Sequence, residues 1–409
     1  MNLTVEQECP QCGAPIELDE TDHVLRCPYC NVKNFLFAPD HFRFVLPHKA
    51  TNKEIIYAPY LRFRGNVYSC QSQAIQHRVV DITHLGTTLK GLPVSLGVRP
   101  QAMKMKFVTP DLAGSFLKSS VRTSDMLTAV GKHASLFISG KTFHRAYIGE
   151  ALSLIYLPVF LANNMIVDAV TNSPITKLPS DHDIFEPTVI NKNPNWGLTF
   201  MATLCPQCGW NLEGERDSVV LTCSNCDTAW EASKGKFTRV DTSIIPGRGT
   251  NTVYMPFWKI SATSKGVEIN SYADFIQVTN QPLVAKKDWG KQDMNFWSPA
   301  FKIRPKIFLH LSRQLTILQP NFRAEKGSAK NNLYPVTLPQ TEAAQGMKLT
   351  LAGSATIKKK IMPLLTRLNF NIKDSSLVYL PFTDTGHDMV QQQTPVSINK
   401  KALEFGRHL

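Results

Sequence analysis

The chain has 409 residues, which is enough for two to four domains of ordinary size. Hydrophobic residues make up 43% of it, so it can bury substantial cores and is not an intrinsically disordered chain. The net charge of +13 favours an anionic partner, such as nucleic acid, a membrane surface or an acidic protein, without choosing among them.

Two features of the sequence argue for a soluble, cytoplasmic protein. The first residues, MNLTVEQECP, lack the basic and apolar regions of a secretory signal. The longest apolar run, ALSLIYLPVFLA at 151–162, is well short of the roughly eighteen residues that a membrane-spanning helix needs.

The first element is a set of four cysteines near the start of the chain. Fourteen residues separate the pair Cys9 and Cys12 from the pair Cys27 and Cys30. Two residues between paired cysteines allow a tight turn to direct both sulfurs at one ion, and a short hairpin brings two such turns together. Gly13 follows the first pair, where the turn favours a positive φ.

The same device occurs again about two hundred residues later. Fourteen residues also separate the second set's two pairs, and Gly209 stands where Gly13 stands in the first. In a reducing compartment such paired cysteines are more often metal ligands than disulfides. The second set consists of Cys205, Cys208, Cys223 and Cys226.

Both sets resemble the zinc-ribbon family over about thirty residues each. The resemblance implies one structural Zn²⁺ in each set, held by four thiolates with no position open for water. Iron is the alternative, because CPQCG and CPYCN also resemble the knuckles of rubredoxin, an electron-transfer protein. The short, polar stretches between the pairs favour zinc. The ninth cysteine, Cys70, is interpreted as a strand residue.

Further motifs recur in the same order after each cysteine set. YAPYLRF from Tyr57 corresponds to YMPFWKI from Tyr254, LGVRP to FKIRP, and SLIYLP to SLVYLP. A ribbon followed by a Tyr-x-Pro-Phe-Trp strand resembles a group of poorly characterised bacterial zinc-ribbon proteins, and this resemblance implies no particular activity. The order of the motifs predicts an internal duplication.

We therefore expect an α+β protein in which each half is a small β zinc ribbon followed by a mixed domain with an antiparallel sheet. Strand hairpins are expected at Asn163-Asn164 and near residues 384–386, and helices within 119–137 and 340–362. The expected domains are ribbon 1 at 1–38, domain 1 at 39–190, a linker at 191–200, ribbon 2 at 201–235 and domain 2 at 236–409.

The basic character belongs to the second half. Residues 1–200 carry 19 Lys and Arg against 16 Asp and Glu, whereas residues 201–409 carry 26 against 16. AFKIRPKIF alternates basic and apolar residues, which on a strand would place the bases on one face. With the run IKKKIM this gives candidate anion-binding or partner-binding residues Lys302, Arg304, Lys306, Lys358, Lys359 and Lys360.

Three functions are compatible with these patterns. No motif or residue set names a reaction, so we lean against an enzyme and predict a zinc-binding scaffold that docks a protein partner or a larger assembly. The acidic segments ELDETD and EGERD favour protein contacts at the ribbons. Nucleic-acid binding through residues 301–373, near the aromatics Trp289, Phe296 and Trp297, is the second hypothesis. A rubredoxin-like iron redox protein is the third.

Overall fold

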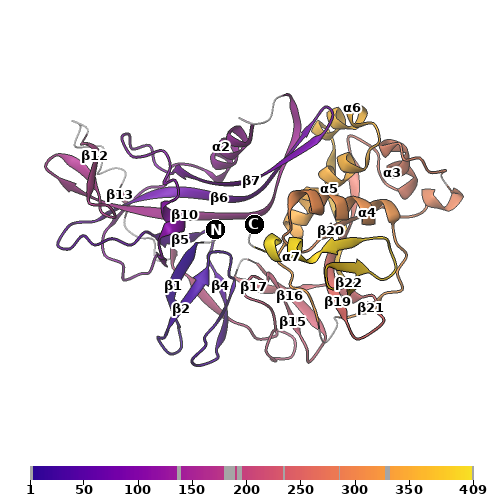
Figure 1. Cartoon of the computed structure of the whole chain (residues 1–409), viewed down its shortest axis with the longest axis horizontal. Helices are drawn as coiled ribbons and strands as arrows, with labels where there is room; N and C mark the ends of the chain where they lie inside the picture. The colour runs from indigo at the N-terminus through magenta and orange to yellow at the C-terminus, as the bar shows by residue number, and fades with distance from the viewer. Residues whose placement is uncertain are drawn as a thin grey trace.

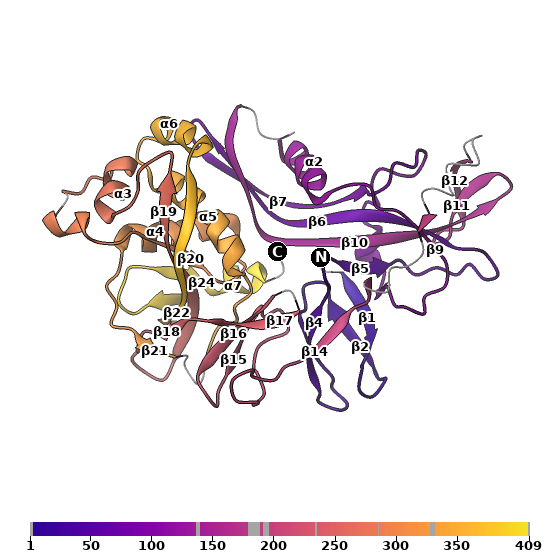
Figure 2. The same cartoon turned by 180° about the vertical axis from the view of Figure 1, so that it is seen from behind.

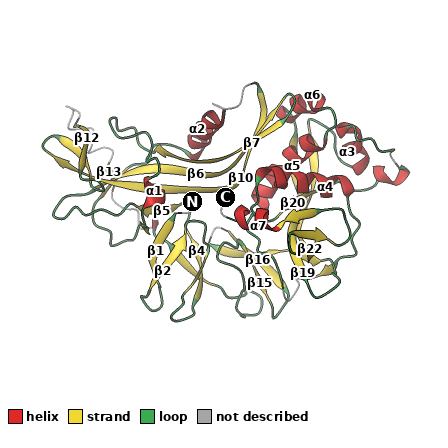
Figure 3. Cartoon of the chain, in the orientation of Figure 1, coloured by secondary structure: helices red, strands yellow, loops and turns green. Residues whose placement is uncertain are grey.

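The computed structural model describes residues 3–135, 140–178, 189–190, 196–233, 235–284, 286–327 and 332–407. It is a mixed α+β structure with mostly antiparallel strands (Figure 3). Half of the proposed linker 191–200, residues 191–195, lies outside the described part of the chain. Among the described residues no helix is long and apolar enough to cross a membrane.

Among its described residues the first half has thirteen strands and two helices. Its helices are α1 (Arg99–Ala102) and α2 (Thr123–Ser135), and α2 lies within the predicted helical stretch 119–137. The strands are β1 (Thr4–Glu8), β2 (Pro15–Asp19), β3 (Val24–Arg26), β4 (Lys33–Phe37), β5 (Phe42–Val45), β6 (Ile56–Gln71), β7 (Ile75–Leu85), β8 (Met105–Phe107), β9 (Ser115–Leu117), β10 (Thr142–Ala162), β11 (Met165–Asp168), β12 (Ser173–Lys177) and β13 (Val189–Ile190).

The second half holds most of the helices. Its strands are β14 (Thr199–Ala202), β15 (Val220–Cys223), β16 (Thr228–Ser233), β17 (Lys236–Val240), β18 (Thr242–Ile244), β19 (Thr252–Lys265), β20 (Asn295–Pro299), β21 (Glu325–Lys326), β22 (Asn369–Asp384), β23 (Asp388–Gln391) and β24 (Ser397–Asn399). Its helices are α3 (Tyr272–Thr279), η4 (Lys287–Gly290), α4 (Pro305–Leu318), α5 (Gln340–Ser354), α6 (Lys358–Ile361), η5 (Met362–Thr366) and α7 (Lys400–Gly406).

A pair of long antiparallel strands organises each half. β6 pairs with β10, and β19 pairs with β22. Nearly every residue of β6 is buried because its alternate side chains enter two different apolar clusters, one with Ala58 and Tyr60 and the other with Tyr57 and Phe63. Helix α2 covers the second of these faces with Met126 and Val130.

The expected strand over 301–307 is wrong, because α4 begins at Pro305. Proline suits the first helical position, since its φ is already helical and that position needs no N–H bond. Downstream, Phe308, Leu311 and Leu315 repeat at helical spacing and are all buried. Lys302 and Arg304, around which basic and apolar residues alternate, therefore lie at the end of a loop that precedes an amphipathic helix.

Both predicted hairpins are present. Asn163 and Asn164 have φ values of 49° and 58° between β10 and β11, which is the conformation of a tight hairpin turn. The second hairpin joins β22 to β23 after Asp384. The predicted helical stretch 340–362 contains α5 and α6 with a break between them.

The ends of β6 and β10 extend beyond their own sheet and pack on the second half. Tyr68, Cys70, Ala146 and Ile148 join the apolar cluster that is otherwise built by residues of the second half. In Figures 1 and 2 these long strands run from the first half to helices α4, α5 and α6. A Cβ on Gly346 of α5 would lie 3.2 Å from Phe308 and 3.6 Å from Ile148, so this glycine allows the close approach.

A buried carboxylate joins the two halves at this contact. β10 has a register shift between Ile148 and Ala151, and the amides of Gly149 and Glu150 point to the same Oε2 of Glu342, at 2.5 and 3.3 Å. Burial raises the pKa of Glu342, and the charge of Lys302 opposes that increase. The pair of amides and the lysine therefore compensate a carboxylate that has lost its water.

We predict that Glu342→Ala lowers the free energy of unfolding by about 3 kcal/mol, because it leaves two buried amides and the charge of Lys302 without their partner. Urea unfolding of the whole chain would measure it. The matched control is Glu325→Ala, which removes an exposed glutamate and is expected to change the stability by less than about 0.5 kcal/mol. Equal effects of both variants would contradict the proposed role of Glu342 in joining the two halves.

Candidate metal centres and the cleft between the ribbons

Each predicted cysteine set comes together in space. Within each set the four Sγ atoms lie within 4.8 Å of one another, so both sets could hold a metal ion. In the first set Cys9 and Cys30 are 3.7 Å apart, and Cys12 and Cys27 are 3.6 Å apart. In the second set the corresponding Sγ distances are 3.7 and 3.5 Å.

These distances fit tetrahedral coordination and exclude disulfides. Four sulfurs at about 2.3 Å from a central ion lie about 3.8 Å from one another. A disulfide would bring two sulfurs to about 2.05 Å. Each set could therefore hold one metal ion, and its four sulfurs would then fill the four tetrahedral positions.

The backbone of each knuckle positions the sulfurs. Gly13 N donates to Cys9 O at 2.9 Å, and Gly209 N donates to Cys205 O at 2.8 Å. Both glycines have a φ of 73°, as the sequence predicted. Sequence reasoning missed Asn31 and Asp227, which follow the second pairs with φ values of 60° and 53°. Their residue types were a usable signal, because Asn and Asp tolerate the left-handed conformation better than most.

The ligands link the interior to the surface. Cys9 and Cys27 belong to the apolar cluster of the first half, whereas Cys205 and Cys223 belong to a smaller cluster that both ribbons share. That shared cluster includes Val24 and Phe35 of the first ribbon and Leu212, Leu221 and Trp230 of the second. The second members of the cysteine pairs lie at the surface. A bound ion would thus hold a surface turn against a buried strand.

The second centre has a hydroxyl beside its sulfurs that the first centre lacks. Trp230 Nε1 donates to Thr228 Oγ1 at 2.9 Å, which leaves the hydroxyl hydrogen free to point at Cys226 Sγ, 3.1 Å away. Val32 holds the corresponding position after Cys30 in the first ribbon. Outer groups of this kind orient metal ligands and tune the strength of binding.

Some acidic side chains of the ribbons pair with basic groups inside the chain, whereas Glu17, Glu213 and Glu215 are exposed. Glu20 is buried between Arg62 and Arg64 of β6, and its Oε1 accepts from Arg64 Nη1 at 2.6 Å. Asp217 of the second ribbon pairs with Arg407 at 2.5 Å. The acidity of ELDETD and EGERD is therefore only weak support for contacts with another protein.

The two ribbons lie side by side and contact each other directly (Figures 1 and 2). β14, which enters the second ribbon, pairs with β4 of the first. Arg216 O accepts from the amides of His23 and Val24 at 2.7 and 2.8 Å, and Lys33 forms an ion pair with Glu213. The ribbons therefore form a connected unit rather than two independent knobs.

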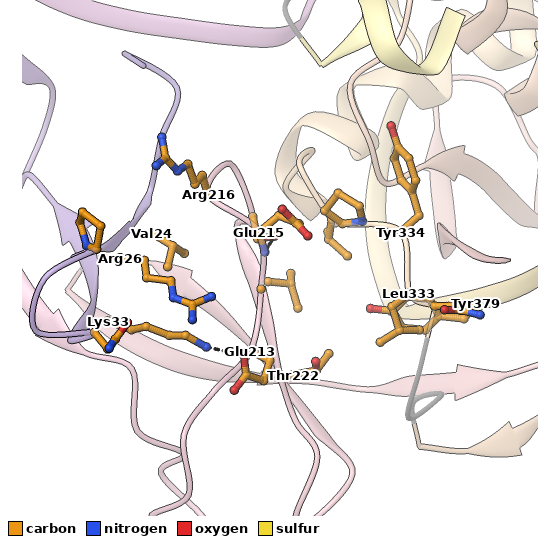
Figure 4. A pocket seen from close by; sticks show the side chains of 18 residues that line it. Val24, Arg26, Lys33, Glu213, Glu215, Arg216, Thr222, Leu333, Tyr334 and Tyr379 are labelled. Carbon is orange, nitrogen blue, oxygen red and sulfur yellow. Dashed lines mark hydrogen bonds and ion pairs between the residues drawn. The ribbon is translucent and has the colours of Figure 1, made fainter. Parts of the chain in front are cut away.

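A cleft of about 710 Å³ lies between the ribbons and the second half (Figure 4). Arg26 and Lys33 line it from the first ribbon, Glu215 from the second, and Tyr334 from the opposite wall. Its volume is in the range of ligand pockets, but its charged groups are of mixed sign and form no arrangement of nucleophile, base and oxyanion donor. The described residues of this cleft do not indicate a particular reaction.

The predicted partner-binding residues fall into two groups. Lys302 is largely buried near Glu342, and Lys358 Nζ donates to three carbonyl oxygens at the end of α5, at 2.6 to 2.8 Å. These two lysines are engaged inside the chain. The remaining four, Arg304, Lys306, Lys359 and Lys360, are exposed.

The single cysteine, Cys70, is fully buried in β6. Burial raises the pKa of its thiol to about 12, which disfavours the nucleophilic thiolate.

Comparisons of the chain with family models, with curated proteins and with solved structures found no match. The class of protein therefore follows from the site itself: an α+β protein with two four-cysteine groups that could bind metal.

We predict that the purified protein contains two metal ions per chain and that Cys223→Ser lowers this to one, because three thiolates hold the ion less well than four. Elemental analysis by mass spectrometry would count the ions. Cys70→Ala is the matched control, since it removes the cysteine that lies outside both sets and should leave two ions. A full metal content in Cys223→Ser would show that the second set is not a metal site.

We also predict that Thr228→Val weakens metal binding at the second centre by about 10-fold, because the hydroxyl that contacts Cys226 Sγ is lost. Competition with a chromophoric chelator would measure the affinities of both centres. Thr222→Val in β15 changes a nearby threonine that makes no described contact with sulfur, and it should leave both affinities unchanged. Equal affinities in wild type and Thr228→Val would rule out this role.

Proposed function

We propose that this protein is a non-enzymatic zinc-binding scaffold that docks another macromolecule at the knuckles of its ribbons. The observation that supports it most is the exposure of large apolar side chains beside the metal ligands. Tyr29 is 68% exposed, Leu204 51% and Trp210 57%. Large apolar groups exposed together often belong to interaction sites.

Zinc is the metal that this proposal requires. A closed four-thiolate site without a water position is typical of structural zinc and supplies folding free energy to a ribbon with little core of its own. Iron in a rubredoxin-like site would give the same sulfur geometry. The absorption spectrum separates the two, because a zinc protein is colourless and ferric thiolate sites absorb visible light.

The second ribbon offers the better-defined docking surface. Leu204 and Trp210 flank the first knuckle, where Cys205 N donates to Trp210 O at 2.7 Å. Arg239 lies beside the same knuckle and donates to Gln207 Oε1 at 2.9 Å. Trp and Arg are the residue types that most often dominate the energy of protein interfaces. We call Leu204, Trp210 and Arg239 the knuckle surface.

We also infer that the two halves are copies of one ancestral unit of ribbon and α+β domain, with boundaries as the sequence predicted them. Tyr57 stands opposite Pro158 in the first pair of long strands, and Tyr254 stands opposite Pro381 in the second. A short strand runs parallel to each pair, β5 beside β10 and β18 beside β22. Equivalent registers of this kind support duplication. Each ribbon would then precede its own pair of long strands in the sequence.

The proposal predicts that partners recovered with the tagged protein depend on the knuckle surface. Affinity purification from the protein's own cells, followed by mass spectrometry, would compare wild type with Trp210→Ala. The variant should recover the specific partners at about one tenth of the wild-type level or less, because removal of an interface anchor often costs 2 kcal/mol or more. Partners that survive nuclease treatment would be protein partners.

The control for this experiment is Val98→Ser, which removes an apolar side chain that is 73% exposed and does not belong to the knuckle surface. It should retain every partner. Metal-depleted protein should lose the same partners as Trp210→Ala. The docking role would be wrong if both the variant and the metal-depleted protein kept all partners.

A further inference from the structure

Helix α4 presents a row of basic side chains to solvent. Lys306, His310 and Arg313 are all exposed and follow one another at spacings of four and three residues, so they lie on one side of the helix. The opposite side is buried through Phe308 and Leu315. Lys306 and Arg313 are therefore about 10 Å apart along the helix axis.

A strand from the first half extends this row. His77 of β7 is exposed, and its ring centroid lies 6.4 Å from that of Tyr68, which in turn lies 6.0 Å from Phe308 of α4. Strand β7 contacts α4, and the pKa of His77 is lowered by its burial and further by the positive charge of Lys306. The tip of the β6–β7 hairpin thus brings a fourth basic side chain to the helix.

Helix α6 carries two further exposed lysines. Burial lowers the pKa of Lys358 to about 8, and the nearby charge of Arg313 contributes to this. Lys358 itself caps α5, whereas the next two residues, Lys359 and Lys360, are exposed. We define the basic face as His77, Lys306, His310, Arg313, Lys359 and Lys360.

Acidic residues do not neutralise this face. Residues 301–373 contain two acids, Glu325 and Glu342. Glu342 accepts from the amides of β10, and Glu325 lies in β21, which pairs with β18. Within the part of the chain that the structure describes, no residue of the basic face forms an ion pair within 4.0 Å. The face therefore carries a field of a single sign.

Two of the three aromatic residues that could stack on unpaired bases are buried. Phe296 and Trp297 are 2% and 3% exposed, whereas Trp289 is half-buried and packs on Tyr272 with the ring centroids 4.8 Å apart. The sequence-based expectation of a stacking platform for single strands is therefore wrong for Phe296 and Trp297. Contacts to a phosphate backbone need only exposed cations, which the basic face supplies.

We propose that the basic face binds the phosphate backbone of double-stranded nucleic acid without reading its sequence. Protein–protein interfaces are depleted in lysine, whereas interfaces with nucleic acid are strongly positive. Half of the basic face is lysine, and both halves of the chain contribute to it. This surface is separate from the knuckle surface, so either proposal can fail without the other.

The test is fluorescence anisotropy with labelled duplexes of about 20 base pairs, one of DNA and one of RNA, titrated at several salt concentrations from about 50 mM upward. Wild-type protein should bind at least one duplex, and its logarithmic affinity should fall linearly with the logarithm of the salt concentration. The double variant Lys306→Glu/Arg313→Glu should bind at least about 10-fold more weakly, with a salt slope smaller by about 2.

The matched control is Lys90→Glu/Lys177→Glu, which makes the same change in net charge at two exposed lysines of the first half. Lys177 ends β12, and Lys90 precedes Gly91, which lies against Thr176 of β12. In Figure 1, β12 lies at the far end of the molecule from α4. It should bind like wild type. Preference for the DNA or the RNA duplex would identify the form of nucleic acid that is bound.

Three results would overturn the proposal. The first is no binding of either duplex at about 50 mM salt. The second is an equal loss of binding in the two double variants, which would reduce the effect to net charge. The third is binding of an acidic polypeptide such as polyglutamate under conditions in which neither duplex binds, which would make an acidic protein the partner. Circular dichroism of the variants would confirm that these exposed substitutions leave the fold intact.

Discussion

The structure depends first on the gathering of four sulfurs at the end of each ribbon. A hairpin of about thirty residues buries too little apolar surface to hold its own shape, and a closed tetrahedral site can supply the missing free energy. In both ribbons one ligand of each pair is buried and its partner lies nearer the surface. Coordination would therefore fix the surface turns to strands that belong to larger apolar clusters, and those clusters reach into both halves of the chain.

Acidic side chains also connect distant segments of the chain. Glu20 of the first ribbon lies between two arginines of β6, Asp217 of the second pairs with Arg407, and Glu342 of α5 accepts from a bulge in β10. Each contact joins segments that are far apart in the sequence. Because these acids turn inward, they are unavailable to the surface, and the excess of basic residues in the second half remains exposed on α4 and α6.

The exposed apolar groups and the exposed basic groups consequently lie on different surfaces of the molecule. One edge carries the ribbons with exposed apolar groups such as Trp210, and the helical side carries cations contributed by α4, α6 and β7. Since the ribbons are joined by β14 and β4, and the halves by the extended strands β6 and β10, the two surfaces are held in a defined relation.

The sequence by itself determined the features that depend on local spacing: the two cysteine sets, the glycines of their first knuckles, the hairpin at Asn163-Asn164 and helix α2. These follow from geometry within a few residues, or from chemistry that only one arrangement of four sulfurs satisfies. Tertiary structure alone decided that 301–307 leads into a helix, that Lys302 and Lys358 are used internally, that Glu20 and Asp217 pair with arginines of the chain, and that His77 lies near α4. The physical reason is that a charge acts on whatever the fold places beside it, and residues hundreds of positions apart become neighbours only when the long strands pack.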